Sequence, residues 1–203
     1  MRPWIRRTVN AVSLVILIGV FAVAGLFAAA ELGVIDTTSD PVVSGPENTS
    51  QIPSVSASEH PEIDGEALEI AVFKRVNEKR TATGVHAFSH SEQVRLISRL
   101  HSKDMAERDY FDHVDPDGGG PEERHARYNG CNLANENLAV LSVNPDDDIK
   151  SLTDRAVEIW SESEGHNTTQ LSDYYYVSGV GVHVTAEGRV YITQNFCREH
   201  PSA

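Results

Sequence analysis

The sequence predicts an α+β fold for its C-terminal two thirds, and three observations lead to this prediction. Helical periodicity fills the first part of the region, and apolar residues alternate with a period of two in the last part. Strands and helices do not alternate along the region in the β-α-β order that builds a parallel sheet. The region from 64 to 203 is long enough for a proper hydrophobic core, so one folded domain is expected there.

The first expected helix runs over residues 64–84 and ends at a glycine. Its buried stripe recurs every four residues, at Leu68, Val72 and Val76. This spacing places all three side chains on one helical face.

Two further helices are expected. One begins at SHSE, where Ser89 and Glu92 have the spacing of a capping box. The other follows the acidic stretch PDDD at 145–148, whose charges suit a helix N-terminus. Helical period is kept by Val94, Ile97, His101 and Met105 in the first of these, and by Ile149, Leu152, Ala156, Ile159 and Trp160 in the second.

A β-hairpin is expected near the C-terminus, over residues 177–197. Apolar residues alternate with small or polar ones on both sides of AEGR, which makes the turn. The shorter apolar run ENLAVLSV at 136–143 predicts another strand.

The N-terminal part predicts a membrane anchor. Residues 1–8 form a basic flank, and residues 9–30 form an apolar run of 22 residues, enough to cross the hydrocarbon layer as a helix. The basic flank should stay in the cytoplasm, which makes the chain a single-pass protein of the cell membrane with its domain outside. A cleaved signal ending at AAA (28–30) and a twin-arginine signal on Arg6 and Arg7 are the alternatives, and either would give a secreted domain.

Residues 31–63 are rich in Ser, Thr, Pro and acidic residues and show no sustained period, which predicts a disordered extracytoplasmic linker. Asn48 begins the pattern NTS and is a candidate glycosylation site. The folded domain is expected to occupy 64–203.

The charge of the exported part restricts its partners. All 30 acidic residues follow the apolar run, together with 14 of the 17 basic ones, so this part carries −16. Such a field repels nucleic acid and anionic lipid head groups, and both are excluded as partners. The acidic composition is typical of halophilic proteins, which predicts a halophilic origin.

Cys131 and Cys197 are the two cysteines. In an oxidising compartment the default for such a pair is one disulfide. Metal binding by these two residues alone is not expected, because structural zinc usually takes four ligands.

Seven short motifs, in this order, resemble the CAP superfamily, whose SCP domain occurs in cysteine-rich secretory and plant pathogenesis-related proteins. They are VNEKR (76–80), HSKDM (101–105), YFDHVDPDG (110–118), NENLA (135–139), WSESEGH (160–166), VGV (180–182) and YITQNF (191–196). The prokaryotic branch is the more similar one, and the likeness spans residues 66–197. It implies an α-β-α sandwich, with a central antiparallel sheet between helical layers and a cleft lined by His and Glu.

The resemblance also implies site residues. His113 matches the family's histidine after the second helix, and Glu136 matches the glutamate of its Gly-Glu-Asn motif, with Asn135 in place of the glycine. Ser163 stands where plant and animal members have a further glutamate. Their second cleft histidine lies in a motif that this chain lacks, and His166 is the candidate to replace it.

His101 lies on an apolar helical face, which favours a buried histidine that supports the cleft wall. His113, Glu136 and His166 are expected to converge as catalytic and metal-binding candidates, because two imidazoles and a carboxylate suit Zn²⁺ or another divalent cation. No HExxH or GxSxG motif accompanies them.

Two functions follow from this set. The first is a binding module whose cleft holds a divalent ion and a small or envelope-derived ligand. The second is a metal-assisted hydrolase, peptidase-like, with Glu136 as general base or ligand. Whether the chain is an enzyme is left open by the sequence.

Overall fold

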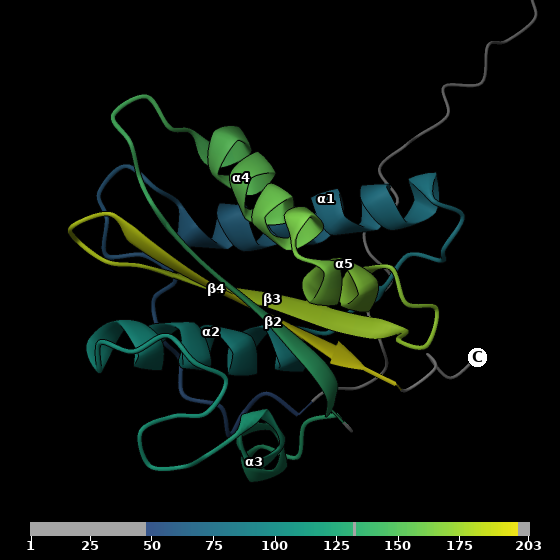
Figure 1. Cartoon of the computed structure of the whole chain (residues 1–203). Coiled ribbons are helices and arrows are strands. Elements are labelled where there is room, and N and C mark those ends of the chain that lie inside the picture. The colour runs from purple at the N-terminus through teal and green to yellow at the C-terminus, as the bar shows by residue number, and fades with distance from the viewer. Residues whose placement is uncertain (1–47, 132, 199–203) are drawn as a thin grey trace, which may run out of the picture. The chain divides into compact units, whose positions relative to one another are not determined.

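The computed structural model describes residues 48–131 and 133–198, except for the side chains of Leu133 and Ala134. Five helices and four strands follow one another along this part of the chain (Figure 1). In order they are α1 (Gly65–Ala82), β1 (Ser89–His90), α2 (Glu92–Glu107), α3 (Pro121–Arg127), β2 (Leu133–Ser142), α4 (Ile149–Glu162), α5 (Glu164–Gln170), β3 (Val177–Val184) and β4 (Arg189–Cys197).

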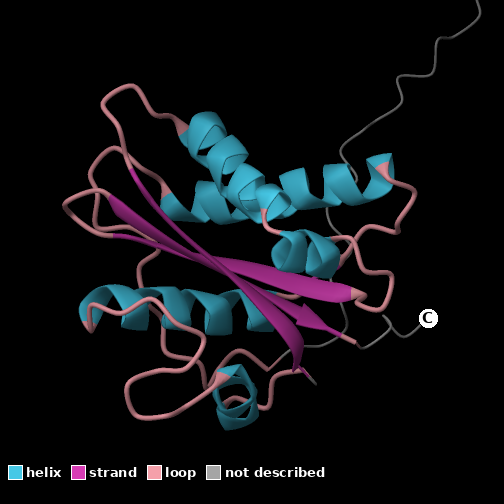
Figure 2. Cartoon of the chain, in the orientation of Figure 1, coloured by secondary structure: helices cyan, strands magenta, loops and turns pink. Residues whose placement is uncertain are grey.

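These elements form three layers. A twisted sheet lies in the middle, with α1, α4 and α5 on one face and α2 and α3 on the other (Figures 1 and 2). The expected sandwich is therefore present, and its α+β class is confirmed.

The sheet has the strand order β1-β3-β4-β2. The hairpin β3–β4 and the pair β2–β4 are antiparallel, but Ser89 and His90 of β1 pair in parallel with Val177 and Ser178 of β3. The predicted antiparallel sheet is therefore present in β2, β3 and β4, but the parallel β1 makes the whole sheet mixed. A strand of two residues is too short to show an alternation that the sequence could reveal.

Helix α2 begins two residues later than predicted. Ser91 is its N-cap and accepts a hydrogen bond from Val94 N at 3.1 Å, while Ser89 belongs to β1. The predicted capping box of Ser89 and Glu92 was therefore wrong, because Ser91 has the N-cap chemistry as well and lies in the correct place. Asp64 caps α1, so this helix begins one residue after the expected start.

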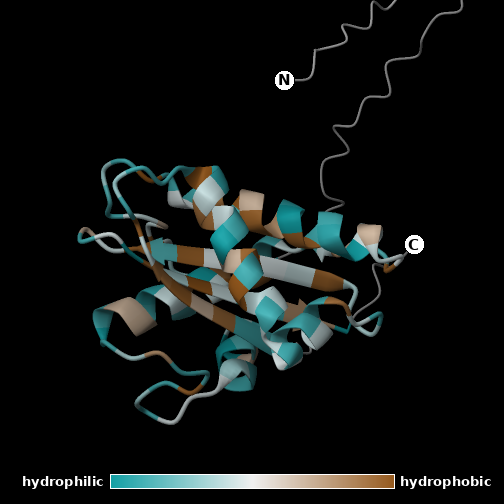
Figure 3. Ribbon diagram, turned by 45° about the horizontal axis from the view of Figure 1, so that its top comes forward, coloured by the Kyte–Doolittle hydropathy of each residue, from teal (hydrophilic) through white to brown (hydrophobic). Residues whose placement is uncertain are grey.

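The apolar core lies between the sheet and the layer of α1 and α4. Leu68, Val72 and Val76 of α1 are fully buried there, as their spacing predicted. Trp160 of α4 is also fully buried, and its indole N–H donates to Leu138 O at 2.8 Å. Figure 3 shows hydrophobic residues along the strands and on the helices.

The opposite face of the sheet is polar where α2 covers it. Asn195 Nδ2 donates to Ser98 Oγ at 2.8 Å, and Ser102 Oγ lies 2.9 Å from Thr193 Oγ1. All four side chains are buried, and these hydrogen bonds satisfy the three hydroxyls and the Asn195 amide nitrogen, which would otherwise be costly to bury.

Glu69 of α1 joins the two helical layers around the edge of β3. Its buried carboxylate accepts Val182 N at 3.0 Å and the Nε and Nη2 of Arg99 at 2.7 and 2.6 Å, and it also pairs with Arg95. The strand β1 pairs only with the first two residues of β3. Further along this edge of β3, the Glu69 carboxylate accepts the Val182 N–H that a neighbouring strand would otherwise bind.

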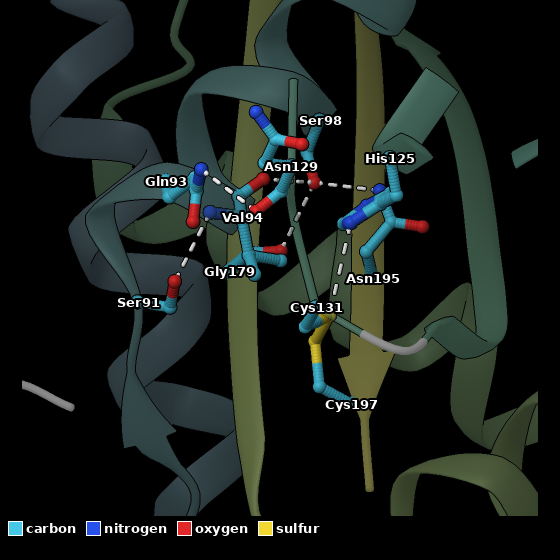
Figure 4. The surroundings of a disulfide bond; sticks show 10 residues. All are labelled: Ser91, Gln93, Val94, Ser98, His125, Asn129, Cys131, Gly179, Asn195 and Cys197. Carbon is cyan, nitrogen blue, oxygen red and sulfur yellow. Dashed lines mark hydrogen bonds between the residues drawn. A yellow bond between two sulfur atoms is a disulfide. The ribbon is translucent and has the colours of Figure 1, made fainter. Parts of the chain in front are cut away.

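The disulfide Cys131–Cys197 is formed and joins the residue two before β2 to the end of β4 (Figure 4). The predicted pairing is confirmed. His125 of α3 lies against it, with Nδ1 3.7 Å from Cys131 Sγ.

Residues 48–63, which the sequence assigned to the linker, pack on the domain. Ser58 forms a parallel bridge with Val184, while Ile52, Ala57 and Ile63 are buried. The sequence did not indicate this packing, since three apolar residues without a regular period resemble those of a linker. Asn48 is exposed, and residues 31–47 lie outside the described part.

Among the described residues, no helix is both long enough and apolar enough to cross a bilayer. The predicted span 9–30 and its basic flank lie outside the residues that the structure describes.

Two glycines of β3 allow α2 to lie directly on the sheet. A Cβ at Gly181 would stand 1.9 Å from Arg99 N, and one at Gly179 would stand 2.3 Å from Arg95 N, both backbone atoms. We expect Gly181→Ala to lower the free energy of unfolding by at least about 2 kcal/mol, because helix or strand must move.

Gly165→Ala is the matched control, since a Cβ at this position of α5 meets nothing within 4 Å. It should leave stability unchanged or raise it by about 0.5 kcal/mol. Urea denaturation measures both variants, and equal stabilities would contradict the close packing of α2 on β3.

Candidate functional site

The site is built around a contact between His113 and Glu136. His113 lies in the loop after α2, and Glu136 lies in β2, where the strand passes this loop. His113 Nδ1 and Glu136 Oε1 are 2.9 Å apart, with the His113 side chain 47% exposed and the Glu136 side chain 1% exposed. Nε2 of His113 has no partner among the described residues, so a ligand can reach the outer part of the ring.

Arg124 of α3 is the second partner of Glu136. Its Nη2 lies 3.1 Å from Oε1 and 3.0 Å from Oε2, so both carboxylate oxygens face the guanidinium. Arg124 also donates to His113 O at 3.0 Å and to Gly119 O at 3.2 Å. One buried arginine therefore fixes the carboxylate and the loop that carries His113.

Sequence reasoning missed Arg124. The residue belongs to the short helix α3, which begins with Pro121 at its first position after Gly120. The only available signal was this proline, a residue favoured at the first position of a helix, followed by a basic residue one turn later.

The ion pair sets the protonation states of the site. Burial opposes the charged form of Glu136, but the His113 hydrogen bond and the Arg124 charge outweigh it and lower the pKa of the carboxyl. The hydrogen bond to Glu136 raises the pKa of His113 in spite of partial burial. His113 is therefore protonated at a higher pH than an ordinary histidine.

His101 of α2 is buried beside this pair. Its Nε2 lies 3.2 Å from Asp112 O and 3.8 Å from Glu136 Oε1, and its Nδ1 lies 3.4 Å from the Tyr110 hydroxyl. Burial lowers the pKa of His101 to about 4, so the ring is neutral at ordinary pH. The buried ring supports the loop through its contact with Asp112 O. Its burial agrees with its place on an apolar helical face in the sequence.

His166 lies within α5 and not after a helix end. Burial, and then the charge of His113, lower the pKa of His166, so the two imidazoles influence each other. Its backbone oxygen accepts Asn137 Nδ2 at 3.1 Å, which ties α5 to β2 beside Glu136. The imidazole makes no hydrogen bond to His113 or Glu136, and its Nδ1 is buried without a partner.

Among the described residues, His113, Glu136 and His166 are not grouped as the ligands of one metal ion. Across residues 48–131 and 133–198, no three His, Cys, Asp or Glu side chains are grouped so that they could hold a metal ion. Glu136 is also engaged elsewhere, because its two oxygens are already hydrogen-bonded by Arg124 and His113. A guanidinium beside the carboxylate also repels a divalent cation.

A cavity of about 540 Å³ adjoins the site between α2, the loop 115–119 and α3. Its wall includes His101 and Arg124, but not His113, Glu136 or His166. The exposed face of His113 and this cavity are therefore separate surfaces. His101 and Arg124 contribute to both, because they line the cavity and also support the loop that carries His113.

Residues 73–196 match the sequence model of CAP, the cysteine-rich secretory protein family. The chain belongs to the CAP family. This match covers the described helices and strands from within α1 to the end of the sheet, including His113, Glu136 and His166.

Two relatives come from Bacillus subtilis (strain 168). The protein YkwD is 28% identical over 116 residues, which are 57% of this chain and 42% of YkwD. The membrane protein YlbC is 36% identical over 131 residues, which are 64% of this chain and 34% of YlbC. Neither relative supports the halophilic origin that the acidic composition predicted.

Among solved structures, an extracellular protein with a SCP domain from Bacillus anthracis has a TM-score of 0.52 at 22% identity, covering 77% of this chain and 45% of that one. This likeness shows the fold. The chain spans less than half the length of each of these three proteins. A structure of NaASP2 with Zn²⁺ is also similar, with a TM-score of 0.49 at 14% identity, covering 71% of this chain and 82% of NaASP2.

The buried pair can be tested by a double-mutant cycle. Arg124→Met leaves Glu136 buried without its main countercharge, and we expect the free energy of unfolding to fall by about 3 kcal/mol or more. Glu136→Gln should also destabilise, because it leaves the guanidinium unpaired.

The double variant R124M/E136Q should cost clearly less than the sum of the single changes, because it removes both charges together. Denaturation in urea measures all four proteins. Additive effects would show that the two side chains are not coupled.

Proposed function

We propose that this chain is a membrane-anchored extracytoplasmic CAP domain whose His113 surface binds a small or envelope-derived ligand without a resident metal ion. The observation that supports this proposal is the half-exposed imidazole of His113, which is held by a buried carboxylate. The membrane contact would be made by residues 9–30, and the domain would face outward, as the description of the family as secretory favours.

The chemistry of His113 points to a ligand with a hydrogen-bond acceptor. Its Nδ1 is engaged by Glu136, so Nε2 is the atom that meets the ligand. Because the pKa of His113 is raised, the ring is a cationic donor over a wider pH range than an unpaired histidine. Carboxylate or amide oxygens are suitable acceptors, and both occur in fragments of the cell envelope.

The net charge of the exported part disfavours polyanions as ligands. Its charge of −16 opposes nucleic acid and anionic lipid head groups, although a small acceptor can still reach one exposed imidazole. The proposed partners are therefore the membrane, through the N-terminal segment, and a small ligand or an envelope component.

A metal-assisted hydrolase on His113, Glu136 and His166 is not favoured. Zn²⁺ needs free lone pairs on its ligands, and those of Glu136 face Arg124 and His113. Glu136 is also a weak general base, because its pKa is lowered.

One observation favours a second candidate, a hydrolase that uses no metal at these residues. Glu136 orients the His113 ring through Nδ1, as a carboxylate orients a catalytic histidine, and leaves Nε2 free to take a proton from water. The two candidates need opposite forms of His113, because binding of an acceptor uses the protonated ring and general-base catalysis uses the neutral ring.

The pH dependence separates them. We expect muropeptides, as carboxylate-bearing envelope fragments, to bind the full chain at about pH 5.5 and to lose about tenfold in affinity by about pH 8, as His113 loses its proton. His113→Gln should remove this pH dependence of the affinity. His86→Gln, at an exposed histidine outside the site, should leave the pH dependence unchanged. Calorimetry measures the affinity, and hydrolysis of peptides or esters that rises with pH and needs His113 would favour the second candidate.

Metal content can be measured on the same preparation. The chain purified without added metal should contain no stoichiometric zinc, and a zinc titration should give the same weak isotherm for the unmodified chain and for His113→Gln. Tight binding at one ion per chain that disappears in His113→Gln or Glu136→Gln would overturn the proposal of a metal-free site.

A further inference from the structure

The loop between α2 and α3 exposes two large apolar side chains. Phe111 and Val114 are 46% and 47% exposed and lie three residues apart. Most large apolar side chains of the described residues are buried, and the other exposed ones are distributed singly over α1, α4 and the segment before β3, as Ile70, Ile159 and Tyr174. Single exposed apolar residues are common on protein surfaces, but two close together on one ordered loop suggest a contact surface.

The backbone of this loop is held in place from below. Tyr110 N donates to Met105 O at 3.1 Å, and the buried His101 lies 3.2 Å from Asp112 O. The buried Arg124 donates to His113 O at 3.0 Å. The exposure of Phe111 and Val114 therefore belongs to a fixed conformation, and a partner would lose little entropy in ordering it.

The loop that carries the two apolar side chains is rich in acidic residues. The loop contains Asp109, Asp112, Asp115 and Asp117. Asp112 and Asp115 accept backbone N–H groups, and Asp117 pairs with Arg108 at 2.9 Å. Asp109, at a positive φ of 52°, makes no ion pair with the described residues. The loop is thus apolar at Phe111 and Val114, and its four aspartates outnumber its one cationic side chain, the half-exposed His113.

We propose that the loop 109–117 is a docking surface for a basic, apolar peptide segment of a partner protein. Apolar side chains of the partner would cover Phe111 and Val114, and its lysines or arginines would face the aspartates. Charge complementarity selects this occupant, because an anionic membrane and a second copy of the exported part at −16 are both repelled. The surface includes His113, but the peptide contact is assigned to Phe111, Val114 and the aspartates and needs no small ligand on the imidazole.

The test uses the full chain in detergent micelles and a short labelled peptide of alternating lysine and valine, with empty micelles as blank. We expect the peptide to bind, and the variant F111S/V114S to lose about tenfold or more in affinity, as buried interface anchors do. The variant I70S/I159S is the matched control, with two exposed isoleucines changed on α1 and α4, and should keep its affinity within about twofold.

Charge is tested separately. The variant D109N/D117N should weaken binding, added salt should weaken it further, and a peptide with glutamate in place of lysine should not bind. Thermal unfolding checks that each variant is folded.

Three outcomes would overturn the proposal. One is equal loss of binding in F111S/V114S and in the control variant, and another is equal binding of the basic and acidic peptides. The third is a dimer of the full chain, seen by sedimentation, that F111S/V114S converts to a monomer, because the surface would then belong to a second copy.

Discussion

A carboxylate that is buried in a protein must be paired or lose its charge, and in this domain Glu136 is paired with Arg124. The pair joins three segments that are distant in the sequence, namely β2, α3 and the loop after α2. Arg124 also holds His113 O and Gly119 O, so the shape of the loop depends on the same guanidinium. The orientation and the raised pKa of His113 follow from this buried interaction, and the same guanidinium helps to hold the loop that exposes Phe111 and Val114.

The sequence predicted the elements that have several turns or a sustained alternation. Helices α1, α2 and α4 and the hairpin β3–β4 carry enough apolar residues for their period to be visible. Helices α3 and α5 have 7 residues each and β1 has 2, so no period can be recognised in them. The segment 48–63 was assigned to a linker for a similar reason. It packs on the domain through a few apolar residues whose spacing in the sequence follows no period.

The candidate site was predicted in part. The family motifs led to His113 and Glu136, which are in contact, and helical spacing placed His101 among buried residues. The chemistry of the site was not visible, because it depends on Arg124, a residue on an unpredicted helix with no motif of its own. A carboxylate beside an arginine behaves differently from a carboxylate between two histidines, and only the fold shows which of the two is present. Membership of the CAP family therefore establishes the scaffold, while the arginine changes what the histidine and glutamate can do.

The central claim is that Glu136, held as an anion by Arg124, raises the pKa of the His113 imidazole. The most direct measurement is the pKa of His113, followed through its imidazole NMR signals as a function of pH in the unmodified chain and in Glu136→Gln. We predict a pKa above the ordinary value of about 6.5 in the unmodified chain and a fall to that value or below it in Glu136→Gln, where burial and the charge of Arg124 both disfavour the protonated ring. The same pKa in both proteins would contradict the account.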